Sequence, residues 1–420
     1  MIERWKLFLL RISRRPWFRA SLYSIMGVAT ALVALAVAPY IPDEVPTKIG
    51  SDAVDNILGV LASSMLAVTT FSLSIMGSAY ASATSNVTPR AISLLVEDPT
   101  TQRTLSTFIG SFIFSLVGII ALSTGLYGEK GRVVLFAATI VVVVLVLYVL
   151  LRWIDLLTGL GRVADTTARV EKAATQALCQ RMAQPFLGGC QLEVDPKVLP
   201  GARPLYAQQV GFVQHVDMPA LGKLTESQAC TVYICVLPGV FVEPTVPIAW
   251  SVGIDAECDD ALRAAFVIGA QRTFDRDPRF GITVMAEIAS RALSPGINDQ
   301  GTAIDVIGRG VRVLSHLSRP TPPEAPAFAR VYAPGLSVAA MFNDFFSPIA
   351  RDGAAIVEVG VCLQQALASL GRIGDAAVEV AANHQAELAL KRAEAGLALP
   401  EDSQRVRQAA VEADLLSLSA

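Results

Sequence analysis

The segment from Asn56 to Pro89 reads NILGVLASSMLAVTTFSLSIMGSAYASATSNVTP and contains no Asp, Glu, Lys or Arg. A helix of this length is about 50 Å long at about 1.5 Å per residue, whereas the hydrocarbon core of a bilayer is about 30 Å thick. We therefore predict a membrane-spanning helix that extends beyond the bilayer on its cytoplasmic side and ends near Pro89.

Three further windows of the 420-residue chain lack charged side chains: Ala20–Pro42, Thr104–Gly128 and Val133–Leu151. Each reaches the roughly 17 to 25 residues that a transmembrane helix needs, while core helices of soluble proteins usually keep a polar face. Only 17% of the chain is charged, against about 25% in a typical soluble domain. The sequence predicts an α-helical membrane domain over residues 20–154, with four transmembrane helices at about 20–42, 56–83, 104–126 and 133–153.

Basic residues flank these spans unevenly. The first 19 residues are rich in Arg and Lys, the first loop between spans is mainly acidic, and more arginines follow the fourth span. Since basic loops stay on the cytoplasmic side, we expect both termini in the cytoplasm. A signal peptide cleaved after Ala36-Val37-Ala38 is the alternative for the first span. The apolar run is long for a signal peptide, so we favour an uncleaved span.

The second span carries a stripe of small and hydroxyl residues. They recur every three or four positions and so share one helix face: Ser63, Ala67, Thr70, Ser74, Ser78, Ala81 and Ser85. One interpretation is close packing against another helix. The other is a water-filled path in an oligomer, with Ser63, Thr70, Ser74, Ser78 and Ser85 as candidate pore-lining residues. No span has an ionisable residue at its centre, which argues against a proton-driven carrier and is compatible with a passive pore.

The rest of the chain predicts a cytoplasmic α+β domain. The helix of the fourth span continues as an amphipathic stalk over 155–185. Alternating apolar residues and frequent Pro and Gly indicate a small β module of about five strands over 186–256. A helical region at 257–318 begins with a helix from Asp259 or Asp260 through Phe274. A Pro-rich loop at 319–335 and C-terminal helices at 336–420 complete the chain.

A connector of sequence SPGIND, Ser294–Asp299, joins a helix over Pro278–Leu293 to one that begins at Gln300. Gly296 permits positive φ, and Asn298 or Asp299 can cap the second helix. The connector is either a structural turn or an anion site at a helix N-terminus. Arg272 and Arg291 before the connector and Arg309 after it are the basic residues that could support the second interpretation. The candidate ligand or coupling residues are Arg272, Arg291, Ser294, Gly296, Asn298, Asp299 and Arg309.

No catalytic, metal or cofactor site is predicted. The six cysteines form no CxxC pair, the three histidines have no metal-ligand spacing, and no nucleophile–base motif is recognised. A net charge of −3 gives no basic field for nucleic acid. The partners we expect are the lipid bilayer and further copies of the chain. The protein is not expected to be an enzyme.

Two segments resemble a known family. They run from Gln271 to Gly281 (QRTFDRDPRFG) and from Arg291 to Asp299 (RALSPGIND). Phe71-Ser72-Leu73-Ser74 and Thr88-Pro89-Arg90 are also similar to it. The family is a bacterial predicted-membrane-protein family, number twenty-two fifty-four among the domains of unknown function. The resemblance extends to about residue 370 and implies a bacterial inner-membrane protein, with no assigned activity.

These features favour an oligomeric channel or channel-like transporter with a cytoplasmic regulatory domain. The stripe, the uncharged spans and the stalk motivate this hypothesis. The alternative is a non-conducting membrane scaffold or sensor whose cytoplasmic domain binds a ligand or partner.

Overall fold

The structure is a computed structural model that describes residues 18, 21–22, 24–26, 28–29, 33, 51–96, 98–124, 129–159, 161–318 and 325–412. The chain forms two compact units. The membrane unit contains the described residues up to Ser85 together with Pro89–Thr166, and the soluble unit contains Asn86–Thr88 and the described residues from Thr167 onward.

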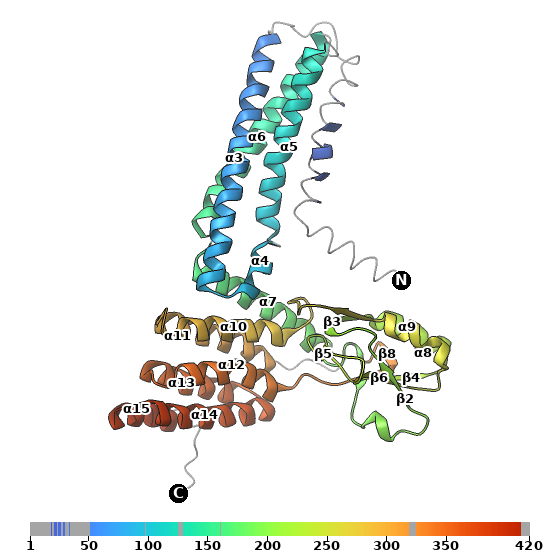
Figure 1. Ribbon diagram of the computed structural model, residues 1–420, viewed down its shortest axis with the longest axis vertical. Coiled ribbons are helices and arrows are strands. Elements are labelled where there is room, and N and C mark those ends of the chain that lie inside the picture. Colours follow the sequence, from blue (N-terminus) through green and yellow to red (C-terminus); the bar gives the residue numbers. More distant parts are fainter. Residues whose placement is uncertain are drawn as a thin grey trace. The chain divides into compact units, whose positions relative to one another are not determined.

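The membrane unit is built on three long helices that run side by side (Figure 1): α3 (Ser51–Asn86), α5 (Pro99–Ser123) and α6 (Glu129–Gly159). Two short elements, η2 (Pro89–Ala91) and α4 (Ile92–Val96), connect α3 to α5. Among the described residues, three helical stretches are long and apolar enough to span a membrane, namely Ala53–Ser85, Pro99–Ser123 and Gly131–Gly159. They correspond to the second, third and fourth predicted spans. The predicted first span, with its possible cleavage site, lies largely outside the described residues.

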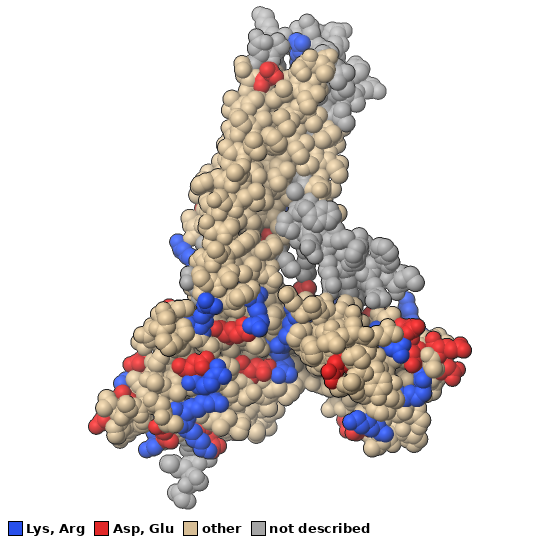
Figure 2. Space-filling model, viewed as in Figure 1, with Lys and Arg blue, Asp and Glu red and all other residues tan. Residues whose placement is uncertain are grey.

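Large apolar side chains hold the three helices together. Leu58 of α3, Phe114 of α5 and Leu135 of α6 are almost fully buried in one cluster. Gly118 permits this packing because a Cβ atom there would lie 3.0 Å from Leu58 Cδ1. The visible face of this unit carries few charged side chains along its length, whereas charges are frequent on the soluble unit (Figure 2).

The predicted continuous stalk is interrupted. Helix α6 ends at Gly159, and α7 (Val163–Ala183) begins a few residues later. Gly161 between them has a φ of 83°, a left-handed backbone that ends a helix and favours glycine. The prediction that the helix of the fourth span continues unbroken as a stalk over 155–185 is therefore wrong.

The soluble unit contains two small sheets. Its strands are β1 (Gly189–Gln191), β2 (Arg203–Tyr206), β3 (Gly211–Val216), β4 (Thr231–Ile234), β5 (Phe241–Val242), β6 (Pro247–Val252), β7 (Phe266–Gly269) and β8 (Phe328–Ala333). The five-stranded sheet has the order β1-β8-β4-β6-β2, with β8 parallel to both β1 and β4. The three-stranded sheet is antiparallel, in the order β5-β3-β7. Helix α8 (Met218–Ser227) packs on β8.

Two of these strands come from outside the predicted module. The helix expected from Asp259 to Phe274 ends early, since α9 (Asp259–Ala264) is followed directly by β7. In β7, Phe266 and Ile268 pair with Val216 and Val213 of β3. Strand β8 lies within the segment predicted as a Pro-rich loop, of which 319–324 are outside the described residues. Both differences arise because long-range strand pairing overrides the local pattern.

Six helices form a stack of three pairs (Figure 1). They are α10 (Pro278–Ala292), α11 (Gln300–Leu314), α12 (Val338–Asp352), α13 (Val357–Ile373), α14 (Ala376–Gly396) and α15 (Pro400–Glu412). Helix α12 packs between α10 and α14, and α13 contacts α11, α14 and α15. Phe342, Phe345 and Phe346 of α12 are fully buried at the centre of the stack.

Two glycines of α11 provide a matched test of this packing. A Cβ atom at Gly310 would collide with the Phe345 ring, whereas a Cβ atom at Gly308 would meet nothing within 4 Å. We expect Gly310→Ala to lower the free energy of unfolding by about 1–3 kcal/mol through overpacking. Gly308→Ala should raise it by up to about 1 kcal/mol through helix propensity. Thermal unfolding of the detergent-solubilised full chain measures both, and equal melting temperatures would contradict the packing described.

Candidate functional site

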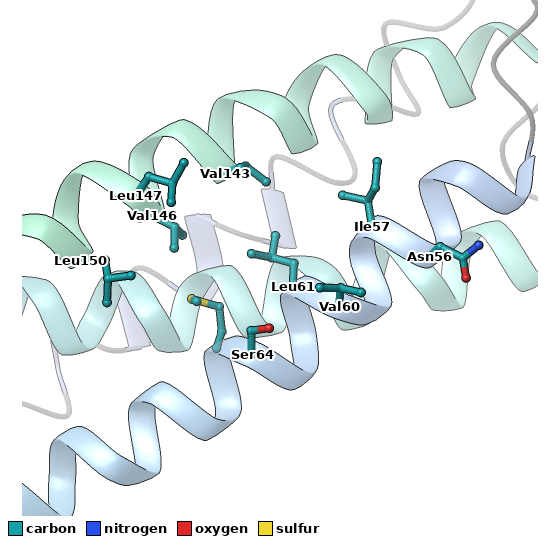
Figure 3. A pocket seen from close by; sticks show the side chains of 10 residues that line it. Asn56, Ile57, Val60, Leu61, Ser64, Val143, Val146, Leu147 and Leu150 are labelled. Atoms are coloured by element: carbon teal, nitrogen blue, oxygen red, sulfur yellow. The ribbon is translucent and has the colours of Figure 1, made fainter.

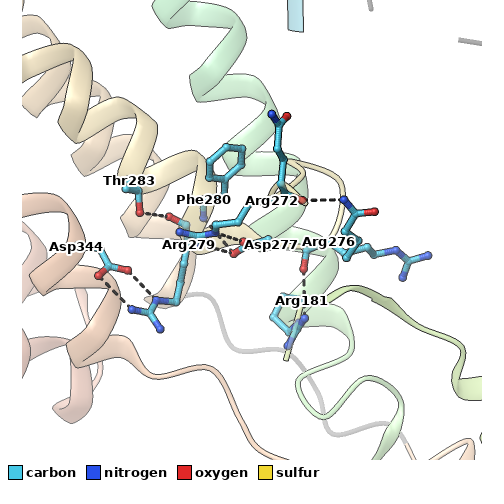
Figure 4. Close-up of polar contacts among 10 residues, drawn as sticks. Arg181, Arg272, Arg276, Asp277, Arg279, Phe280, Thr283 and Asp344 are labelled. Atoms are coloured by element: carbon cyan, nitrogen blue, oxygen red, sulfur yellow. Dashed lines mark hydrogen bonds and ion pairs between the residues drawn. The ribbon is translucent and has the colours of Figure 1, made fainter. Parts of the chain in front are cut away.

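The start of α10 is organised around one buried carboxylate. Asp277 is only 3% exposed and caps the helix, accepting a hydrogen bond from the backbone N–H of Phe280 at 3.1 Å. Arg272 binds it with two nitrogens: Nε lies 2.7 Å from Oδ2 and Nη2 lies 3.0 Å from Oδ1 (Figure 4). A bidentate, charge-assisted pair of this kind is strong and fixes the relative orientation of its partners.

The same carboxylate rests against the β module. Gly239, in the loop between β4 and β5, has a φ of 96°, and a Cβ atom there would overlap the carboxylate of Asp277. Only glycine fits this position. The contact joins the sheet region to the first helix of the stack.

Arginines extend the network on both sides (Figure 4). The guanidinium of Arg272 lies 5.0 Å from the centre of the Phe280 ring, a cation–π contact. Arg279 makes a bidentate pair with Asp344 of α12, at 2.7 and 3.1 Å. Arg181, from the last turn of α7, is 5% exposed and donates from Nη2 to the Arg276 carbonyl oxygen at 3.3 Å. Burial lowers the pKa of Arg181 to about 10, and nearby Asp277 partly opposes this, so the side chain is protonated at neutral pH.

The SPGIND connector is a capped turn at the surface. Asp299 is the helix cap and accepts hydrogen bonds from Thr302, from N at 2.9 Å and from Oγ1 at 2.6 Å. These bonds from Thr302 lower the pKa of Asp299. Gly296 permits positive φ but does not adopt it. The left-handed residue is Asn298, with φ of 52°, because its N–H closes the turn onto the Ser294 carbonyl at 2.8 Å and Asn tolerates this backbone.

The candidate residues of the coupling site do not converge. Arg272 lies at the end of α10 opposite to the connector, about 22 Å away along the helix axis. Arg309 lies on α11 and pairs with Asp305 and Glu171. Of the three arginines, only Arg291 adjoins the connector, since its carbonyl oxygen accepts a hydrogen bond from the Ser294 hydroxyl at 2.6 Å. The seven residues therefore fall into three separate places.

Glu171 of α7 is the centre of one of these places. It accepts hydrogen bonds from Arg309 Nη1 at 2.8 Å and from Arg312 Nε at 2.7 Å. Burial alone would raise the pKa of Glu171, but the hydrogen bonds and charges of the two arginines outweigh it, and the pKa is lowered. This cluster fastens α7 to α11.

The five candidate pore-lining residues of α3 are all exposed on the membrane unit. The opposite face of α3, which includes Leu58, Leu61 and Met65, is the buried one. Three of the stripe hydroxyls bond within their own helix: Ser63 donates to the Gly59 carbonyl at 2.9 Å, Thr70 to the Leu66 carbonyl at 2.9 Å, and Ser85 to the Ser82 carbonyl at 3.1 Å. The stripe is thus not covered by α5 or α6.

A groove between α3 and α6 lies beside the stripe (Figure 3). Its volume is about 430 Å³, and its lining is Asn56, Ile57, Val60, Leu61, Ser64, Met65, Val143, Val146, Leu147 and Leu150. The lining is almost entirely apolar, so it suits a hydrocarbon chain or a bulky side chain rather than a hydrated ion.

The sequence interpretation missed Asp277, Arg181, Glu171 and Asp344. Asp277 carried a usable signal, because Asp followed by Pro marks a helix start. Arg279 and Asp344 are 65 residues apart, so no local spacing reveals their pair. In the described part of the chain, no group of three or more His, Cys, Asp or Glu side chains could hold a metal ion.

Glu171→Gln tests the cluster on α7. We expect a loss of about 1–3 kcal/mol of unfolding free energy at pH 7, since the charge-assisted hydrogen bonds from Arg309 and Arg312 weaken. The lowered pKa of Glu171 stabilises the fold above the ordinary value of 4.5, and this contribution disappears as the pH falls through the folded value. Melting temperatures of native and variant chains should therefore converge below about pH 4.5.

Glu387→Gln is the control, since Glu387 pairs with Lys391 at the exposed surface of α14. It should leave stability at pH 7 unchanged. An equal effect of the two substitutions, or a constant gap from pH 7 to pH 3, would contradict the role given to Glu171.

Uncharacterised proteins of Mycobacterium bovis and of Mycobacterium tuberculosis strain H37Rv are each 34% identical to this chain over 125 residues. These matches cover 28% of this chain and 24% of each relative, so the chain spans about a quarter of the length of the curated relatives it matches. No solved structure matches the chain. The model of a predicted membrane protein family covers residues 13–369, and the chain thus belongs to the predicted membrane protein family DUF2254.

Proposed function

We propose that the protein is a channel-like homo-oligomer of the bacterial inner membrane, with both termini in the cytoplasm. In this proposal the stripe of α3 faces a shared central path, and the soluble unit regulates conduction. No catalytic step is assigned to the chain.

The main observation in support of this proposal is the composition of the exposed face of α3. On α6 the most exposed side chains are bulky and aliphatic, such as Val141, Val144 and Leu151, as expected for contact with lipid. The exposed face of α3 instead carries the stripe of small and hydroxyl residues, beside the exposed bulky side chains Val60, Leu66, Phe71 and Leu73. Small residues in membranes favour close approach of a second helix, and hydroxyls favour water. Both properties fit a helix that faces other copies and a path between them.

The hydroxyl geometry supports a neutral path. Since Ser63 and Thr70 donate their protons to carbonyls of their own helix, their oxygen lone pairs remain available to water or a permeating cation. No charged residue lies on α3 between Asp55 and Arg90. Such a lining suits passive conduction rather than ion-coupled pumping.

A non-conducting scaffold or sensor is the second candidate. The stack of three helix pairs favours it, because arrays of stacked helix pairs present extended surfaces to partners. In that case the stripe packs helix against helix, without a path.

Cysteine cross-linking tests the assembly. With Ser74→Cys, oxidation of the full chain in membranes should give disulfide-linked dimers, since the α3 stripes of neighbouring copies are close. Val144→Cys, on the lipid-facing side of α6, should give few. The unsubstituted chain controls for the six native thiols, none of which lies in α3, α5 or α6. Equal cross-linking at the two positions would contradict an interface at the stripe.

Conductance tests the path itself. The purified full chain in a planar bilayer should give discrete current steps. Ser74→Leu should reduce the unitary conductance several-fold, because a bulky side chain narrows the path. Val144→Leu, which introduces the same side chain on α6, should leave it unchanged. An assembled oligomer without current would favour the scaffold, and unchanged conductance with Ser74→Leu would place the path elsewhere.

A further inference from the structure

Arg181 has an unusual environment for a buried charge. Its side chain is 5% exposed, and only Nη2 has a partner, the Arg276 carbonyl oxygen. Both statements hold for the residues that the structure describes, among which Nη1 has no hydrogen-bond partner although it is buried. An unpaired buried donor on a charged group is costly, so a group that accepts from Nη1 would stabilise this part of the fold.

A small cavity lies at this side chain. It is lined by Ala177, Gln180, Arg181, Gln184, Leu187 and Arg276, and its volume is about 20 Å³. This is room for one group of about the size of a water molecule. Gln180 and Gln184 are exposed, so the cavity can be reached from solvent.

The local charge balance is positive. Asp277 is the carboxylate that acts most strongly on Arg181, but its oxygens are bound by Arg272 and by the N–H of Phe280. In the part of the chain that the structure describes, no carboxylate lies within ion-pair distance of Arg181. Figure 4 shows the Arg276 side chain directed away from it, so the charge at the base of the cavity is that of Arg181.

We propose that this cavity binds a small inorganic anion of halide size, held by Nη1 of Arg181. The carboxamides of Gln180 and Gln184 can donate further hydrogen bonds at the rim. The anion supplies the negative charge that a buried guanidinium normally receives from a carboxylate. This site lies in the soluble unit and does not rest on the proposed conduction.

Chloride is the probe for this site. The melting temperature of the full chain in detergent should rise, with saturation, as sodium chloride replaces sodium gluconate at constant ionic strength, because ligands of the folded state stabilise it. Arg181→Gln should abolish this rise. Arg351→Gln should retain it, because Arg351 is an exposed arginine that pairs with Asp352 on α12.

Gln184→Leu keeps the proposal testable if Arg181→Gln does not fold. It leaves the buried charge in place, and the chloride concentration at half-saturation should increase about tenfold through loss of a hydrogen bond to an anion. In crystals grown with bromide, an anomalous peak should lie beside Nη1. A cavity that holds only water would give no peak and no halide dependence in the unsubstituted chain. That result would overturn the proposal. So would a melting temperature that depends on chloride equally in Arg181→Gln, Gln184→Leu and the unsubstituted chain.

Discussion

The carboxylate of Asp277 is the interaction on which the arrangement of the soluble unit depends. It caps α10, neutralises Arg272 and lies against the backbone of Gly239. Two segments that are distant in sequence, 272–280 and the loop at Gly239, thus meet at one buried charge. Removing one member of a buried pair generally costs about 3–5 kcal/mol, because the remaining charge is left without compensation. Gly239 is constrained for the same reason, since any side chain would occupy the space of the carboxylate.

A different constraint governs the membrane unit. Hydrocarbon offers no hydrogen-bond partners, so the backbone groups of a span must be satisfied inside the protein, and most hydroxyls in this unit also bond internally. Thr69, Ser115 and Thr139 are buried and bond to carbonyls four residues earlier, at 2.6, 2.9 and 2.7 Å. Ser63 and Thr70 do the same on the exposed face. A hydroxyl that is satisfied in this way can face a neighbouring helix or water without cost, which is why the stripe is compatible with both interpretations of α3.

Features that depend on local chemistry could be predicted from the sequence. The charge-free windows gave the positions of α3, α5 and α6, and Pro278 and Asp299 marked helix boundaries that the structure confirms. Features that depend on distant partners could not. Strand β8 is defined by parallel pairing with β1 and β4, and Arg279 finds Asp344 on another helix. The break at Gly161 and the left-handed backbone at Asn298 are local features. Glycine and asparagine are also frequent where the backbone is neither broken nor left-handed, so these residues alone did not reveal them.

Helix α7 connects these observations. Three of its contacts with the rest of the soluble unit lie along one side. Glu171 binds two arginines of α11. Ala174 packs closely on Gly281: a Cβ atom added at Gly281 would lie 2.6 Å from the Ala174 Cβ. Arg181 donates a hydrogen bond to the Arg276 carbonyl oxygen. The first contact is a compensated ion pair and the second is close apolar packing. The third is a lone hydrogen bond from a cation without a carboxylate. Of these three contacts, the one at Arg181 is therefore the only one with an uncompensated charge, and an anion in the adjacent cavity would supply the missing compensation.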